Sequence, residues 1–275
     1  MAELVLKDGS KKQFPDGISL AEAVKQLSNS LAKKVLVAKV NGEVTDLRET
    51  IVDGSTVEFL TFADQEGKDT LRHTASHVMA QAIQHLFPGV KFAIGPSIEN
   101  GFYYDLDTEH RFTQEDFAAI EAEMAKIVKE NLPITKEVLS RADALKLFKD
   151  AGQDYKVELI EDLPEDSVIS FYSQGEFTDL CAGPHLMSTK PVKAFKLTSL
   201  AGAYWRGSEK NKMLQRVYGT SYPKKAELEE YLHMMEEAKK RDHRKLGKEL
   251  GLFMMHEAGP GFPFFLPNGI IIKNE

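Results

Sequence analysis

Short apolar runs separated by turn signals fill the first sixty positions and surround one helical pattern. Asp8-Gly9, Asn41-Gly42 and Asp53-Gly54 mark tight turns, because glycine adopts a positive φ without a Cβ clash. Ser19 and Glu22 have the spacing of a capping box, and the apolar positions after them share one face, which predicts a helix from Leu20. Two strands, a helix and two or three further strands predict a ubiquitin-like β-grasp module over residues 1–63.

Helical and strand-like patterns alternate from residue 64 to 222, after a polar, glycine-containing linker. Apolar positions repeat at helical spacing over residues 71–86, and a second helical repeat follows Thr113. Ser140 is placed to cap a third helix. Strand-like runs lie at residues 90–94, 102–106, 134–139, 168–172 and 214–218. This mixture predicts a larger α+β domain over residues 64–222.

The remainder of the chain has a different character. Pro223 opens a strongly charged pattern that predicts one linker helix over residues 223–250, suited to a spacer between domains. Residues 251–275 are rich in glycine, proline and phenylalanine, and Ile270-Ile271-Ile272 predicts a strand without partners. We expect residues 251–275 to be the truncated start of a third domain.

Composition limits the class of protein. Of the 275 residues, 42% are hydrophobic and 28% charged, which is typical of a globular chain. The net charge of −7 argues against a general polyanion binder but leaves room for a local basic patch. We expect no membrane association, because no apolar run could span a bilayer and no signal peptide begins the chain. The single cysteine, Cys181, excludes an internal disulfide, and we expect a cytoplasmic protein.

Two histidines stand four residues apart in the first predicted helix of the larger domain. His73 and His77 therefore project from one side of that helix. At about 100° per residue they lie roughly opposite its apolar stripe, so they should face either water or a separate cleft. An exposed histidine pair of this kind often lies on the protein surface without a functional role.

A second group follows in Asp179-Leu180-Cys181-Ala182-Gly183-Pro184-His185. Cys181 and His185 can converge from a turn, and with His73 and His77 they form a plausible zinc set. They could equally act without metal, with a histidine as general base and Asp179 as its orienter or as a partner for a substrate amine. The plainer alternative is a buried cysteine in a tight loop with a capping histidine nearby.

Two further side chains are weaker candidates. Lys156, on a helix or strand edge, could stabilise an oxyanion or attract a phosphate, although most such lysines are surface charges. Tyr104, in a predicted strand, could present its hydroxyl to a cleft, although tyrosines in strands often pack in the core.

The motif His73-Thr74-Ala75-Ser76-His77, together with the segment from Asp179 to His185, resembles the editing domain of threonyl-tRNA synthetases. It is similar also to the editing domain of alanyl-tRNA synthetases. Residues 1–63 resemble the TGS domain of the threonyl family. Residues 241–247 and 250–253 are similar to its linker and to the first segment of its class II catalytic domain.

The resemblance implies hydrolysis of mischarged seryl-tRNA(Thr). A missing methyl group is worth only about 1–3 kcal/mol of discrimination, so a second, hydrolytic sieve is needed. The family's editing residues correspond to His73, His77, Lys156, Asp179, Cys181 and His185, with Tyr104 as a substrate-binding candidate. The implied roles are water activation for His73, ribose or oxyanion contact for Lys156, and ammonium binding for Asp179. Cys181 and His185 would shape the pocket.

The resemblance also implies partners and cofactors. The partner is tRNA(Thr), and the full-length enzyme forms a homodimer that uses ATP, Mg²⁺ and zinc outside the editing domain. Editing is expected to need no metal, and zinc on His73, His77, Cys181 and His185 is the less favoured alternative. Two other functions stay open: a non-catalytic tRNA-binding or regulatory module, and a stand-alone trans-editing deacylase.

Overall fold

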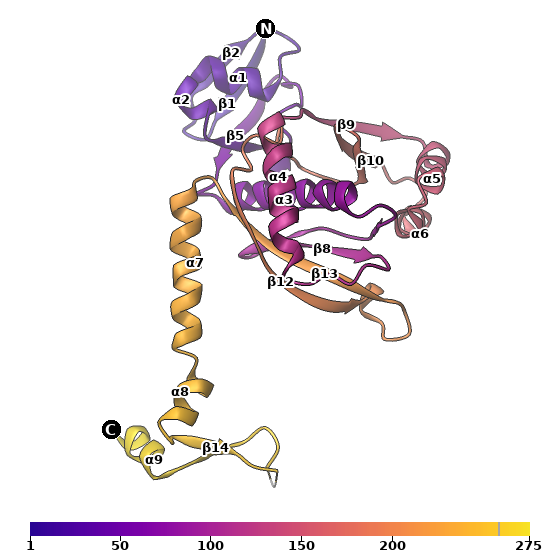
Figure 1. The fold of residues 1–275 in the computed structure, drawn as a ribbon. Helices are drawn as coiled ribbons and strands as arrows, with labels where there is room; N and C mark the ends of the chain where they lie inside the picture. Colours follow the sequence, from indigo (N-terminus) through magenta and orange to yellow (C-terminus); the bar gives the residue numbers. More distant parts are fainter. Residues whose placement is uncertain (258) are drawn as a thin grey trace. The chain divides into compact units, whose positions relative to one another are not determined.

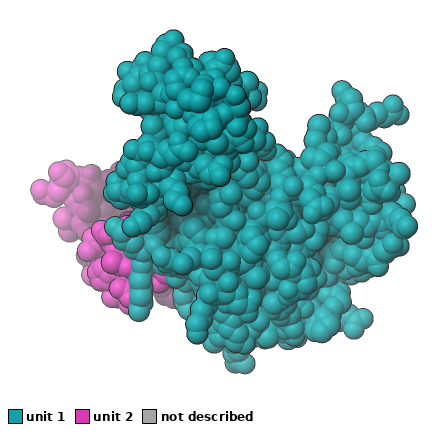
Figure 2. Space-filling view, turned by 90° about the horizontal axis from the view of Figure 1, so that it is seen from above, with its two compact units in different colours: residues 1–225 teal, residues 226–275 magenta. Residues whose placement is uncertain are grey.

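The computed structural model describes residues 1–257 and 259–275, which form two compact units. Unit 1 comprises residues 1–225 and unit 2 comprises residues 226–275, coloured separately in Figure 2. Each unit has its own secondary structure, and the candidate residues all lie in unit 1. No helix among the described residues combines the length and apolar character that crossing a membrane requires.

Unit 1 begins with a five-stranded sheet of order β2-β1-β5-β3-β4 (Figure 1). Its elements are β1 Ala2–Leu6, β2 Lys11–Phe14, α1 Leu20–Leu27, α2 Asn29–Ala32, β3 Val35–Val40, β4 Glu43–Thr45 and β5 Ser55–Thr61. The first and last strands pair in parallel, and the predicted capping box of Ser19 and Glu22 is present. The β-grasp prediction is confirmed, and α2 is an addition to it.

The second layer of unit 1 is a sheet of order β12-β13-β8-β6, with β7 also paired to β8. Helices α3 and α4 cross one face of this sheet (Figure 1). Their bounds are α3 Gln65–Leu86, β6 Lys91–Phe92, β7 Ser97–Ile98, β8 Gly101–Asp107, α4 Asp116–Glu130, β12 Ala194–Tyr204 and β13 Met213–Tyr222, with a short 3-10 turn at Trp205–Gly207.

A third sheet of unit 1 has the order β11-β10-β9. Two helices connect β9 to β10 in the chain (Figure 1). The elements are β9 Ile134–Leu139, α5 Arg141–Asp150, α6 Asp154–Asp162, β10 Ile169–Gln174 and β11 Phe177–Leu180. Ser140 caps α5 as predicted, because its side chain accepts a hydrogen bond from the Asp143 backbone. The mixed composition confirms the α+β prediction for this region.

Several predicted bounds in unit 1 were wrong. Helix α3 begins at Gln65 rather than Leu71, because Asp64 closes a tight turn on Thr61 and the chain enters the helix at once. The strand expected over residues 90–94 is reduced to Lys91–Phe92. Helix α4 begins at Asp116, whose carboxylate accepts the Thr113 N–H at 2.7 Å, so Thr113 stands outside the helix.

Unit 2 differs most from the sequence prediction. It contains most of α7 (Lys225–Lys240), then α8 His243–Glu249, β14 Phe253–Met255, β15 Pro263–Phe265 and α9 Pro267–Asn274. The prediction of a single linker helix was wrong, because the helical conformation is interrupted at Arg241 and Asp242. The Asp242 side chain then caps α8. The strand at Ile270-Ile271-Ile272 was also wrong, because Pro267 starts a helix there.

Candidate active site

Helix α3 presents both histidines to the interior of unit 1. His77 is only 3% exposed and His73 is half-buried. The expectation of a position opposite the apolar stripe overlooked that α3 is enclosed: nearly every residue from Thr70 to Ile83 is buried. The surface-pair alternative for these two histidines is therefore wrong, and they contribute to an internal polar cluster.

The loop after β11 brings Cys181 and His185 to the same cluster. Cys181 Sγ lies 3.3 Å from His73 Nε2 and 3.3 Å from His185 Nε2. The Gly183 N–H donates to the same sulfur at 3.2 Å. The predicted convergence of the two pairs across more than a hundred residues is confirmed.

A buried ion pair closes the other side of the cluster. Lys156, on α6, places its Nζ 2.6 Å from Asp179 Oδ1, and both side chains are almost fully buried. The Tyr104 hydroxyl donates to Asp179 Oδ2 and accepts from Lys156 Nζ at 3.1 Å. His77 Nε2 lies 3.4 Å from Asp179 Oδ2, which joins this pair to the histidines. Lys156 is thus an internal charge rather than a surface one.

Burial controls the protonation of the cluster. Desolvation lowers the pKa of His73 to about 4 and that of His77 to about 3, and it holds the pKa of His185 well below its usual value. Desolvation and then the charge of Asp179 raise the pKa of Cys181 to about 12. For Asp179, burial is the largest influence and raises the pKa, but the Lys156 ammonium, His77 and the hydrogen bonds from Lys156 and Tyr104 together outweigh it, so the net pKa is lowered. The neutral cluster therefore contains imidazoles and a thiol beside one ion pair.

Sequence reasoning missed four residues that hold the cluster in place. Thr74 Oγ1 lies 3.1 Å from His185 Nδ1 and accepts the Leu186 N–H at 3.1 Å. Asp46 and Arg48 approach from the β-grasp module, and Tyr172 from β10. Thr74 stands inside the HxxxH motif and could have been suspected, whereas nothing in the sequence around Asp46 links it to a segment 139 residues away.

The donor set fits a metal ion in kind and in spacing. The ligand atoms of His73, His77, Cys181 and His185 all lie within 4.8 Å of one another. Ligands of a tetrahedral zinc stand roughly 3.3–3.8 Å apart, close to the two sulfur–nitrogen distances here. Among residues 1–257 and 259–275, the buried side-chain nitrogen and oxygen atoms without hydrogen-bond partners are Arg48 Nη1, which is ion-paired with Asp46, and Arg72 Nε. None of them belongs to the three histidines.

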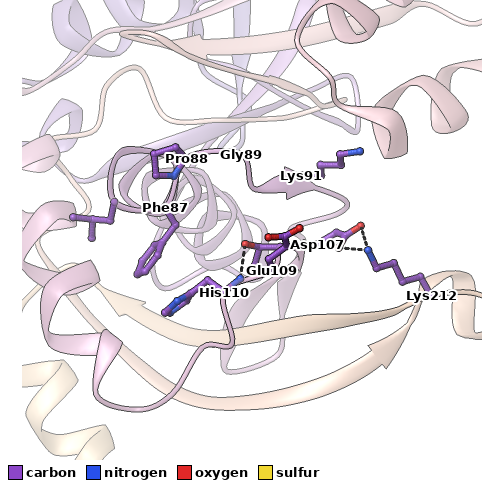
Figure 3. Close-up of a pocket in the computed structure, with 10 residues that line it drawn as sticks. Phe87, Pro88, Gly89, Lys91, Asp107, Glu109, His110 and Lys212 are labelled. Atoms are coloured by element: carbon purple, nitrogen blue, oxygen red, sulfur yellow. Dashed lines mark hydrogen bonds and ion pairs between the residues drawn. The ribbon is translucent and has the colours of Figure 1, made fainter.

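Two cavities lie nearby in unit 1. One, of about 230 Å³, is lined by Lys156, Thr178 and Asp179 together with Phe148 and Phe177, so it opens directly onto the ion pair. The other, of about 770 Å³, lies between the loop after α3 and the end of β8 (Figure 3). Its Lys212 is paired with Asp107 at 2.7 Å, and it shares no residue with the cluster.

Two protein families match the chain. The family described as "TGS domain" matches residues 3–61, and the family described as "Threonyl and Alanyl tRNA synthetase second additional domain" matches residues 169–218. The chain carries a TGS domain and the second additional domain that is described for threonyl- and alanyl-tRNA synthetases. The match to the second additional domain includes Asp179, Cys181 and His185, while the other cluster residues come from chain before it.

Curated relatives extend the likeness to the whole chain. It is 64% identical over 274 residues to a threonine–tRNA ligase of Clostridium novyi (strain NT), covering 100% of this chain and 43% of the ligase. It is 61% identical over 275 residues to a threonine–tRNA ligase of Clostridioides difficile (strain 630), with the same coverage of both. The chain thus spans less than half the length of these relatives.

Proposed function

We propose that this chain hydrolyses the ester bond of seryl-tRNA(Thr) and spares threonyl-tRNA(Thr). The observation that carries the proposal is the meeting of His73, Cys181 and His185 with the buried Lys156–Asp179 pair. The cavity of about 230 Å³ beside that pair is of a size to admit an aminoacyl group rather than a long chain. The match to the second additional domain of threonyl- and alanyl-tRNA synthetases supports the proposal.

The proposed roles follow from exposure and charge. His73 is the more accessible histidine of the HxxxH pair and is neutral near pH 7, so it can accept a proton from water or hold water for attack. Lys156 supplies a fixed positive charge that can stabilise the oxyanion or contact the terminal ribose. Cys181 and His185 lie against one another beside His73 and would shape the surroundings of its imidazole.

Asp179 has a more restricted role than the sequence suggested. Both of its carboxylate oxygens already have partners, Lys156 on one and the Tyr104 hydroxyl on the other. We therefore propose that Asp179 first positions those two groups, and binds the substrate ammonium only where a partner moves aside. Tyr104 would then act through Asp179 and Lys156, which its hydroxyl contacts.

We propose that hydrolysis needs no metal. The Cys181 sulfur contacts the Nε2 atoms of His73 and His185 within the protein, and the high pKa of the Cys181 thiol favours its neutral form in the protein alone. If zinc binds, His73, His77, Cys181 and His185 are the residues that would hold it. A zinc held by all four would be structural, whereas a zinc held by three of them would keep an open position at which it could polarise water.

The longer protein is proposed to be a threonine–tRNA ligase. Its substrates would be threonine, ATP with Mg²⁺, and tRNA(Thr), and its zinc would lie outside the chain described here. We propose a homodimer and a cytoplasmic location for that protein. The ligase activity is supported by the name of the relatives, and the remaining proposals by the family resemblance of the sequence motifs.

The test compares seryl- and threonyl-tRNA(Thr) as substrates of the chain. We expect hydrolysis of the seryl ester well above buffer and little of the threonyl ester. His73→Ala and Lys156→Ala should each slow the reaction by about two to four orders of magnitude. His85→Ala is the matched control, since His85 lies on the same helix but binds Glu123 and Glu176 instead. Equal rates on both esters would refute the proposal.

A chelation experiment tests whether hydrolysis needs a metal ion. Protein treated with a strong chelator should be free of zinc by elemental analysis and retain its full deacylation rate. If activity disappears with the metal and returns with one zinc per chain, the four residues are ligands and the metal-independent proposal is wrong.

A further inference from the structure

The TGS domain reaches into the proposed editing site through one loop. We infer that Asp46, between β4 and β5, is a positioning residue that fixes the loop carrying Cys181 and His185, and the inference rests on the proposed function of that loop. The consequence is a site assembled from both domains of unit 1. The TGS domain thus helps to hold the loop that carries Cys181 and His185.

Asp46 makes three contacts from a nearly inaccessible position, with 2% of its surface exposed. Its Oδ1 accepts the backbone N–H of His185 at 2.8 Å, and its Oδ2 accepts the hydroxyl of Tyr172 at 2.6 Å. Arg48 Nη1 lies 2.5 Å from Oδ1 and balances the carboxylate's charge. A buried carboxylate with three partners has little freedom, so it fixes the backbone of His185.

Arg48 secures the same loop from its other end. Its Nη2 donates to the backbone oxygens of Ile134 at 3.1 Å and Leu186 at 2.8 Å. Its guanidinium carbon lies 5.4 Å from the centre of the Tyr172 ring. Asp46 and Arg48 therefore bind backbone groups of two adjacent residues, the His185 N–H and the Leu186 carbonyl oxygen, and Arg48 also binds strand β9.

Tyr172 transmits the contact to the sulfur side of the loop. A Cβ at Gly183 would stand 2.1 Å from the Tyr172 hydroxyl oxygen, so that hydroxyl lies directly against the Gly183 backbone. Gly183 in turn donates its N–H to Cys181 Sγ. The Tyr172 ring also lies 4.6 Å from that of His185, centre to centre. Asp46 therefore supports the Cys181–His185 turn at His185 directly and at Gly183 through Tyr172.

The experiment uses the single cysteine as a position sensor. Cys181 is the only thiol in the chain, so the rate of its reaction with a disulfide reagent such as DTNB reports the loop alone. The variants are Asp46→Ala and Asp46→Asn, the latter keeping an acceptor for the His185 N–H. Glu49→Ala is the matched control: Glu49 joins the same two domains through Lys136 at 3.0 Å but does not touch the loop.

We expect Asp46→Ala to accelerate the thiol reaction by about tenfold or more and Asp46→Asn to accelerate it less, while Glu49→Ala leaves it within twofold. Deacylation of seryl-tRNA(Thr) should lose about 10- to 100-fold in kcat for Asp46→Ala, with KM within threefold, because misplacing a catalytic group affects the reaction step. Recovery of part of this loss by the Asn variant would match a positioning role.

An unchanged thiol rate in folded Asp46→Ala would overturn the inference, as would an equal acceleration by Glu49→Ala. If Asp46→Ala does not fold, folded Asp46→Asn and Tyr172→Phe decide in its place, and unchanged thiol rates in both overturn it. The thiol measurement needs no tRNA. If the parent chain hydrolyses neither ester, the proposed function fails, while the thiol rates still decide whether the TGS domain holds the loop.

Discussion

Asp179 is the residue on which the polar contacts of the site converge. It is bound to Lys156 on one oxygen and Tyr104 on the other, with His77 within 3.4 Å. Removing either member of a buried ion pair leaves the other charge without a partner in a medium that solvates it poorly. The stability of unit 1 should therefore depend on the pair more than on either residue.

We predict that Lys156→Met and Asp179→Asn will each lower the free energy of unfolding by about 3–5 kcal/mol. The double variant should cost less than the sum of the two, because it leaves no unpaired charge. Urea denaturation of the four proteins forms the double-mutant cycle. Strict additivity would mean that the two charges do not interact in the folded chain.

The histidines predict how stability depends on pH. The folded pKa values of His73 and His77, about 4 and about 3, lie below the ordinary 6.5, so unfolding takes up protons once the pH falls below 6.5. Their stabilisation is complete above that pH and is lost as the pH falls from 6.5 towards the folded values. The slope should reach about 1.4 kcal/mol per pH unit for each histidine.

Urea denaturation at several pH values between 7.5 and 5 measures this slope. His77→Gln should reduce the slope by up to about 1.4 kcal/mol per pH unit, which is the contribution of one proton. His85→Ala should not reduce the slope, because the net pKa of His85 is raised. A free energy of unfolding that is constant over this range would contradict the buried, neutral histidines.

At this scale the sequence predicted the residues with recurring spacing and missed those without it. The HxxxH and CxxxH pairs have a spacing that geometry makes meaningful, and they converge as expected. The burial of Lys156 could not be predicted, because one lysine in a mixed helix has no pattern of its own. Asp46 was missed for the same reason, since its partners are distant in sequence.

Among the elements, α3 carries the most buried positions of the site and has a tight fit at its start. A Cβ on Gly67 would lie 1.9 Å from the Thr61 carbonyl oxygen, which belongs to the backbone of β5. Neither atom can move without shifting the helix or the strand. Glycine at this position lets the helix that bears both histidines pass directly against the TGS sheet.

We predict that Gly67→Ala will destabilise unit 1 by about 1–3 kcal/mol despite the better helix propensity of alanine. Gly202→Ala is the control, because its Cβ would meet the flexible, exposed side chain of Met213. Thermal unfolding of both variants measures the difference. A Gly67→Ala protein as stable as the parent would show that α3 can shift at no cost.

Elements with local signals were predicted well, and those decided by tertiary contacts were not. The capping box at Ser19 and the cap at Ser140 place α1 and α5 correctly. Strand β12 was missed because small and polar residues dominate its exposed positions, so its apolar alternation is weak. Helix α9 overrode the strand preference of three isoleucines because Pro267 sets a helical start and Gly269 packs against Leu252.

For the molecule as a whole, the two units bury very different proportions of their residues. Among the described residues of 226–275, the buried helical positions are Leu228, Gly247 and Gly269, and Phe262 is 72% exposed. Unit 1 contains the three sheets and almost all of the core. A segment with so few buried contacts opens at a lower free energy than the rest.

We predict that brief trypsin treatment will cut first within residues 239–245, where Lys239, Lys240, Arg241, Arg244 and Lys245 lie around the break between α7 and α8. The remaining fragment should keep the main thermal transition of the intact chain. Mass spectrometry identifies the cuts. First cuts inside residues 1–225 would contradict the difference between the units.

The order of domains was predictable from composition and pattern, because each region has its own periodicity. The contacts between regions were not, since they depend on single polar residues such as Asp46 and Arg48 rather than on any repeat. The predicted boundaries at residues 63 and 222 stay predictions, while the β-grasp and α+β classes are confirmed.

The pairing of Thr74 with His185, 111 positions apart, has a consequence for synthesis on the ribosome. At roughly 5–20 residues per second, about 6 to 22 s separate the emergence of the two partners. Through that interval the histidines of α3 and the carboxylate of Asp46 have left the exit tunnel without the loop they later hold. Assembly of the cluster is therefore a late event of folding, which cannot begin before the segment around Pro184 has been synthesised.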